Sequence, residues 1–165
     1  MLAKSAAVLL GLAFLASACG SRIDYSGGLR ATAPSPPQEK AIARYASQNL
    51  ASNLGSGDGY ATSKVGCAFA SMATTPLTGN GLLVYGQALC QTCPPATTGE
   101  VLPVVVRLDG NTVLSAEGVT AAGDPEFQNQ VDRLFPKPLR RAAIAQNLPN
   151  VGQLETEAHD EGRCS

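Results

Sequence analysis

The chain lacks tryptophan and contains only one histidine among its 165 residues. Only 15% of the residues are charged, and 12 basic residues against 13 acidic ones leave a net charge of −1. A net charge this small provides no long-range field to attract nucleic acid or anionic lipid. The hydrophobic fraction of 44% is too high for a wholly disordered chain. We therefore expect one small folded domain and no nucleic-acid partner.

The motifs of common enzyme classes are also absent. The sequence contains no Gly-x-Gly-x-x-Gly, no Walker phosphate-binding loop, no Gly-x-Ser-x-Gly and no His-Glu-x-x-His. The single histidine, His159, lies between Glu155 and Glu161 in a polar stretch. A catalytic base must be held against a nucleophile and oriented by a third group, and nothing near His159 is expected to do so. The sequence therefore predicts no catalytic residue, no metal ligand set and no cofactor.

The first nineteen residues carry the most specific pattern. The first four include one positive charge, and residues 6–18 contain no charged residue. This run of 13 residues is shorter than the roughly 20 that span a bilayer. It therefore predicts a signal peptide over residues 1–18. Small residues then lead directly into Cys19, namely Ala16, Ser17 and Ala18.

The segment Leu15-Ala16-Ser17-Ala18-Cys19 resembles the lipobox of bacterial lipoproteins. The resemblance implies cleavage before Cys19, a diacylglyceryl group on its sulfur and, usually, a fatty acid such as palmitate on the new amino group. It implies a lipid anchor on the outer face of the plasma membrane, or on the outer membrane where the cell has one, because Gly20 is not Asp. Ordinary secretion after Ala18 and a retained buried helix are the alternatives. Lipidation of Cys19 leaves four of the five cysteines, and an oxidising compartment favours an even number.

The mature chain divides into three predicted regions. Residues 19–36 are predicted to be the lipidated cysteine and a flexible tether, because Gly, Ser, Ala, Thr and Pro dominate there. The alternative is that this segment belongs to the fold. Residues 37–148 are predicted to form a single α+β domain, and residues 149–165 a loose polar tail.

The domain is expected to open with an amphipathic helix. Ser35 and Gln38 have the spacing of a capping box, and Gly55 offers a stop. Apolar residues recur between them at helical spacing, namely Ile42, Tyr45, Ala46, Leu50 and Leu54.

Four strand-like segments follow, at residues 65–74, 82–89, 101–108 and 112–119. Asn80-Gly81 and Asp109-Gly110 are typical of tight hairpin turns, so we expect an antiparallel meander. Pro103 lacks an N–H donor and is expected at an edge or at the start of a strand. A helix capped by Asp124, with Pro125 in its first turn, and a second helix over residues 139–148 are expected to close the domain.

A helix followed by four antiparallel strands resembles the cystatin-like and nuclear transport factor 2-like proteins, in which a sheet curls around a helix. The resemblance implies an α+β fold, with the N-terminal helix packed on a four-stranded antiparallel meander and short C-terminal helices. The Gln-x-Val-x-Gly segment of cystatin inhibitors is absent, so protease inhibition is not implied. Residues 65–136 also resemble small uncharacterised exported bacterial domains, a likeness that implies no activity.

The cysteines that remain after lipidation are Cys67, Cys90, Cys93 and Cys164. A tight turn at Asn80-Gly81 places Cys67 opposite residue 94, one residue from Cys93 and four from Cys90, and a bulge or a longer loop could align it with either. We therefore expect a structural disulfide from Cys67 to one of this pair, with Cys164 bonding the other.

Two other interpretations of the cysteines stay open. Cys90-Gln91-Thr92-Cys93 has the spacing of thiol–disulfide oxidoreductases, although Pro94-Pro95 follow a strand and the βαβ context of a thioredoxin fold is missing. Alternatively, Cys67, Cys90 and Cys93 together with Cys164 or His159 have the residue types of a zinc site.

The expected function is a non-catalytic one. We expect a lipid-anchored extracytoplasmic domain that binds a protein, an envelope polymer or a small apolar molecule on the concave face of the sheet, near Tyr85. An envelope thiol–disulfide oxidoreductase that uses Cys90 and Cys93 is the second hypothesis, and envelope scaffolding without a specific ligand is the third.

Overall fold

The structure is a computed structural model that describes residues 28–50, 64–93, 99–119 and 123–162. The bounds of its helices and strands are α1 (Pro36–Asn49), β1 (Val65–Pro76), β2 (Gly81–Thr92), β3 (Gly99–Asp109), β4 (Thr112–Gly118), α2 (Phe127–Leu134), α3 (Lys137–Ala145) and α4 (Val151–Glu161). The four strands form one antiparallel sheet in the order β1-β2-β3-β4. The expected α+β fold, with a leading helix, a meander and short C-terminal helices, is confirmed.

Helix α1 begins where the sequence predicts it. The backbone N–H of Ser35 donates to Oε1 of Gln38 at 2.8 Å, one half of a capping box. The Gln38 amide also donates to the carbonyl oxygen of Gly110 at 2.8 Å, which ties this end of α1 to the β3–β4 turn. The predicted continuation to Leu54 falls in residues 51–63, outside the described part of the chain.

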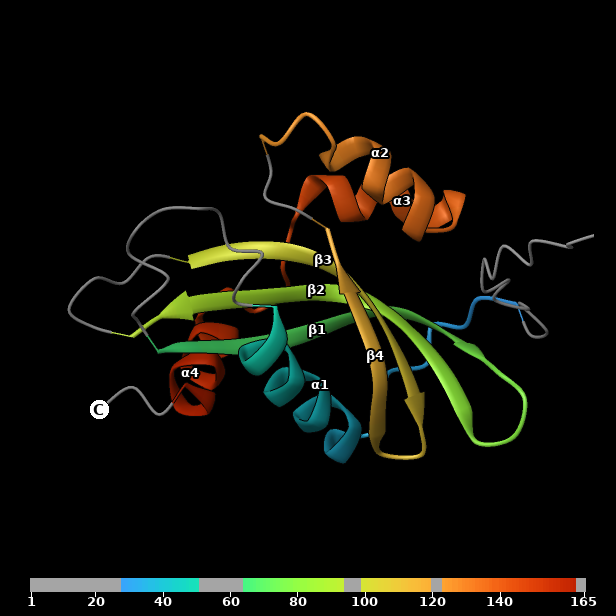
Figure 1. Cartoon of the computed structure of the whole chain (residues 1–165), viewed down its shortest axis with the longest axis horizontal. Helices are drawn as coiled ribbons and strands as arrows, with labels where there is room; N and C mark the ends of the chain where they lie inside the picture. Colours follow the sequence, from blue (N-terminus) through green and yellow to red (C-terminus); the bar gives the residue numbers. More distant parts are fainter. Residues whose placement is uncertain (1–27, 51–63, 94–98, 120–122, 163–165) are drawn as a thin grey trace, which may run out of the picture.

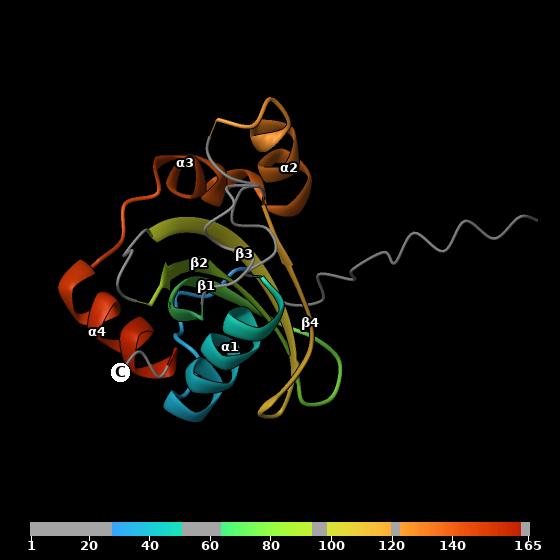
Figure 2. The same ribbon diagram turned by 60° about the vertical axis from the view of Figure 1, so that its left-hand side comes forward.

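The sheet curves around α1 (Figure 2). Three residues of the predicted apolar stripe are buried, namely Ile42, Ala46 and Leu50. They form one core cluster with residues from the concave face of the sheet, including Val84, Leu102 and Val106. The concave face is therefore filled by α1.

At one end of the sheet the opposite face is covered by α2 and α3 (Figure 1). At the other end it is covered by α4, whose Leu154 and Ala158 cluster with Ala68 and Leu89. Tyr85 is fully buried on this face, with its ring centroid 5.9 Å from that of Phe135. The buried Gln87 amide donates to the carbonyl oxygen of Ala142 in α3 at 3.1 Å. The expectation of a concave binding surface near Tyr85 is wrong, because α1 occupies the concave face and Tyr85 lies in the core on the other side.

The β1–β2 connection differs from the expected tight turn at Asn80-Gly81. The backbone N–H of Leu77 donates to the carbonyl oxygen of Gly81 at 2.8 Å, so the loop comprises residues 78–80. Its left-handed residue is Gly79, with φ of 69°. Three loop residues instead of two change the register of the strand pair, which matters for the cysteines below.

The β3–β4 hairpin at Asp109-Gly110 is confirmed. Asp109 lies opposite Thr112, and Gly110 has a φ of 56°. The Pro103 carbonyl oxygen accepts from Val119 N–H at 2.8 Å, just beyond the last residue of β4. Pro103 therefore lies inside the inner strand β3 rather than at an edge or a strand start. Because the N and O of one strand residue point to the same side, the donor that proline lacks would face Val119, where the pairing of β3 with β4 ends.

The starts of the next two helices differ from expectation. Helix α2 begins at Phe127 rather than at Pro125, because the Asp124 side chain accepts from the Glu126 N–H at 2.8 Å and forms a turn ahead of the helix. Helix α3 covers residues 137–145 instead of 139–148. Pro138 lies in its first turn, where a proline is tolerated.

The expected polar tail over residues 149–165 is instead largely helical and part of the domain. Helix α4 buries Leu154 and Ala158 against β1, in a cluster that includes Ala68. Gly66 permits the contact, since a Cβ at this position would lie 1.8 Å from the Ala158 carbonyl oxygen. The prediction failed because this helix buries only two apolar residues, one turn apart.

The expected tether over residues 19–36 is partly docked on the domain. Arg30 and Thr74 of β1 exchange two backbone hydrogen bonds of 2.8 and 2.9 Å. The Thr74 hydroxyl donates to the Thr32 carbonyl oxygen at 3.1 Å, and Pro34 is buried. The folded domain therefore includes residues on both sides of the predicted 37–148 boundaries.

Candidate functional site

Cys67 and Cys90 form a disulfide that joins the neighbouring strands β1 and β2. They lie directly opposite each other, because the three-residue loop and a bulge between Ser71 and Ala73 shift the register from the expected one. Both cysteines are fully buried. The predicted bridge from Cys67 is confirmed, and its partner is Cys90 rather than Cys93.

Cys93 is disulfide-bonded as well. Since Cys67 and Cys90 bond each other, the partner of Cys93 lies outside the described residues. The Cys93 Sγ lies 3.7 Å from the carbonyl oxygen of Gly162, two residues before Cys164. Cys19 and Cys164 both fall outside the described residues, so lipidation of the first and pairing of the second stay predictions.

These bonds bear on the zinc hypothesis. Zinc binds cysteine as thiolate, and the sulfurs of Cys67 and Cys90 are bonded to each other. The other candidate ligand, His159, has a side chain that is 51% exposed, with its Nδ1 3.8 Å from Oδ1 of Asp160. Among the residues that the structure describes, no group of three or more His, Cys, Asp or Glu is placed to hold a metal ion.

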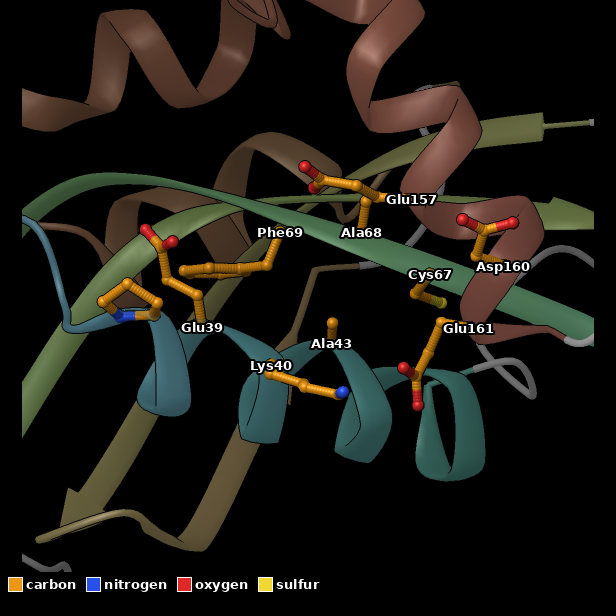
Figure 3. Close-up of a pocket in the computed structure, with 10 residues that line it drawn as sticks. Glu39, Lys40, Ala43, Cys67, Ala68, Phe69, Glu157, Asp160 and Glu161 are labelled. Carbon is orange, nitrogen blue, oxygen red and sulfur yellow. The ribbon is translucent and has the colours of Figure 1, made fainter.

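A groove of about 440 Å³ lies at the edge of the sheet between α1 and α4 (Figure 3). Its floor is formed by Cys67, Ala68 and Phe69 of β1. Its walls are rich in carboxylates from the two helices, namely Glu39, Glu157, Asp160 and Glu161. Sequence reasoning missed this groove, because one wall belongs to the segment that was expected to be a loose tail.

The floor of the groove is the edge of β1 itself. Successive side chains of a strand point to opposite faces, and Phe69 packs in the cluster around α1 whereas Ala68 packs in the cluster around α4. Three consecutive residues line one groove only where the strand is open along its edge. β1 is the outer strand of the sheet, and the Cys67 N–H donates to Oγ of Ser47 in α1 at 2.8 Å.

The groove carries an excess of negative charge. Burial and, to a smaller extent, the nearby Glu157 carboxylate raise the pKa of Glu39 above its usual value. Arg44 Nε lies 3.4 Å from Oε1 of Glu161, but the Arg44 side chain is 59% exposed, so this pair is weak. Among the described residues that line the groove, Lys40 alone carries positive charge.

Within the described residues, no helix is long and apolar enough to span a bilayer. No protein-family model, curated protein or solved structure matches the chain. What the chain does must therefore be inferred from its own residues and their arrangement.

Proposed function

We propose that this chain is a lipid-anchored lipoprotein of the cell envelope, whose disulfide-linked domain has a non-catalytic binding role outside the cytoplasm. The observation that carries the proposal is the Cys67–Cys90 disulfide, which is fully buried inside the sheet. Disulfides persist in oxidising compartments and are rare in the cytosol. The short apolar run that leads into Cys19 supplies both the export signal and the anchor.

The anchor is expected to hold the domain close to the membrane. Each buried CH₂ of an acyl chain contributes about 0.8 kcal/mol, so two or three chains on Cys19 hold the protein durably. Arg30 is bonded to β1, which leaves ten residues, and thus eleven Cα–Cα steps, between Cys19 and the first residue held by the sheet. At about 3.3–3.6 Å per extended residue, this connection spans at most roughly 40 Å.

We favour the binding role over a thiol–disulfide oxidoreductase. Such an enzyme cycles a bond between the two cysteines of its C-x-x-C segment, and it needs an accessible thiolate to attack the substrate. Here Cys90 is bonded to Cys67 and buried, and Cys93 is bonded to another cysteine.

Membrane fractionation tests the anchoring half of the proposal. The wild-type chain is expected to fractionate with membranes and to incorporate labelled palmitate, and Cys19→Ser is expected to do neither. Ser21→Ala, two residues further on, is the matched control and should behave as the wild type. A wild-type chain that takes up no label and is recovered in the soluble fraction would contradict the proposal.

Mass spectrometry of the unreduced protein tests the redox half. We expect peptides that link Cys67 with Cys90 and, given the position of Gly162 beside Cys93, peptides that link Cys93 with Cys164. A linked Cys90–Cys93 pair that exchanges readily with small dithiols would instead favour the oxidoreductase.

A further inference from the structure

The edge of β1 between Cys67, which bonds Ser47, and Thr74, which bonds Arg30, borders the groove between α1 and α4 (Figure 3). We propose that this groove binds an extended peptide segment of a partner protein, which adds to the edge of β1 and places a Lys or Arg side chain between Glu39 and Glu157. This assignment rests on the proposed binding role and names the class of its partner.

The backbone of β1 offers hydrogen-bonding groups along this edge. The backbone N–H and C=O groups of successive residues in an antiparallel strand point alternately toward the neighbouring strand and away from it. The backbone groups of Cys67 point away from β2, because its N–H donates to a hydroxyl of α1. Those of Thr74 also point away from β2, because they bond the backbone of Arg30. Phe69 and Ser71 share this outward orientation, with the bulge after Ser71 accounting for the odd spacing to Thr74. Within the described residues, their backbone N–H and C=O groups have no partner.

An edge of this kind pairs readily with another extended chain. Arg30 already pairs with β1 in the antiparallel sense, at Thr74. The part of the β1 edge that Arg30 leaves uncovered leads to Phe69, where the groove begins. The groove has a volume of about 440 Å³, which accommodates side chains of an added segment. Main-chain bonds to the edge would supply affinity, and the walls of the groove would select the side chains.

The charge of the walls selects a basic partner. Glu39 and Glu157 face the same groove and repel each other, as the raised pKa of Glu39 reflects, and a cationic side chain between them removes this repulsion. A second copy of this chain is disfavoured, because pairing two β1 edges would bring both sets of carboxylates together. The internal segments outside the described residues contain no Lys or Arg to fill the groove.

The test uses the full chain in neutral detergent and a fluorescein-labelled hexapeptide, Thr-Val-Lys-Val-Thr-Val, with binding followed by fluorescence anisotropy at low ionic strength. The peptide is expected to bind, and Glu39→Gln and Glu157→Gln are each expected to weaken it roughly fivefold, as expected for loss of one partly exposed ion pair. Glu155→Gln is the matched control, since it removes the same charge from α4 outside the groove and should leave the affinity unchanged.

Two altered probes separate strand addition from simple charge attraction. A peptide with the same sequence and N-methylated backbone amides cannot complete the main-chain bonds and should lose its binding. A peptide with Glu in place of Lys should also fail to bind. The proposal would be overturned by equal binding of the N-methylated peptide, or by displacement of the peptide with an equal concentration of spermidine. Equal weakening by Glu155→Gln and Glu157→Gln, or no binding at all, would overturn it too.

Sedimentation of the chain without peptide tests whether a second copy of this chain occupies the groove instead. We expect a monomer in detergent, and a dimer that the peptide dissociates would overturn the proposal in favour of a second copy of this chain. Fractionation and palmitate labelling read out the anchor independently of this groove. A labelled, membrane-bound chain that fails to bind the peptide would therefore refute the groove assignment alone.

Discussion

Removal of the Cys67–Cys90 bridge is expected to destabilise the domain substantially. The bridge joins residues separated by 23 positions, and it lies in the core cluster that also contains α1. In the chain-entropy model, a cross-link that closes a loop of this size lowers the conformational entropy of the unfolded chain, which stabilises the fold by about 3 kcal/mol. Domains of this size are typically stable by only about 5–15 kcal/mol, so the loss is a large fraction of the total.

The assay is urea and thermal unfolding of Cys67→Ala/Cys90→Ala beside the wild type. Both proteins are kept without reductant, so that the bond of Cys93 is intact in each. A loss of about 3 kcal/mol corresponds to a decrease in Tm of roughly 10 °C for a domain of this length. The matched control is Ser71→Ala, a small substitution in the same strand away from the bridge, which is expected to change the unfolding free energy by less than about 0.5 kcal/mol.

Two results would refute this reasoning. An unfolding free energy of the double variant within about 0.5 kcal/mol of the wild type would mean that the bridge does not constrain the unfolded chain. Free thiols at Cys67 and Cys90 in the native, unreduced wild type would mean that the bridge does not form in solution.

Three further substitutions test the packing of α4 and the charge of the groove. Gly66→Ala is expected to destabilise the domain by at least about 2 kcal/mol, because the new methyl group would clash with the Ala158 carbonyl oxygen. Gly152→Ala, with open space around it in α4, should instead stabilise by up to about 1 kcal/mol, and equal effects of the two in urea unfolding would contradict the close packing of α4 on β1. The pKa of Glu39 is raised in the folded state, so the folded state binds a proton at this carboxylate more tightly than the unfolded state does. The ionised carboxylate therefore destabilises the fold in full at neutral pH. This destabilisation is relieved as the pH falls through the raised pKa toward the ordinary value of 4.5. Glu39→Gln should abolish that part of the increase in unfolding free energy on acidification, and an unchanged pH profile would show that Glu39 does not experience burial and the Glu157 charge.

The parts of the fold that the sequence predicted are those with strong local periodicity. The stripe containing Ile42 and Ala46 identified α1, because one face of the helix meets the whole sheet. Asp109-Gly110 identified its hairpin, because the turn is short and needs a left-handed glycine. The Asn80-Gly81 dipeptide led to a wrong predicted register between β1 and β2, because it lies here at the end of a longer loop. Gly79, and not Gly81, is the left-handed residue of that loop.

The parts that the sequence did not predict depend on contacts between distant segments. Helix α4 buries little apolar surface of its own, and its position depends on the missing side chain of Gly66. The groove combines Glu39 of α1 with Glu157 of α4 over the edge of β1, so no local pattern contains it. For the same reason, the choice of Cys90 over Cys93 as the partner of Cys67 required the observed register.

The mass of the N-terminal peptide of the exported chain is the most direct test of the proposed function. We expect a peptide that begins at Cys19, carries diacylglyceryl and acyl groups, and is recovered from the membrane fraction. A peptide that begins at Met1, from soluble protein with reduced cysteines, would contradict a lipid-anchored domain of the cell envelope.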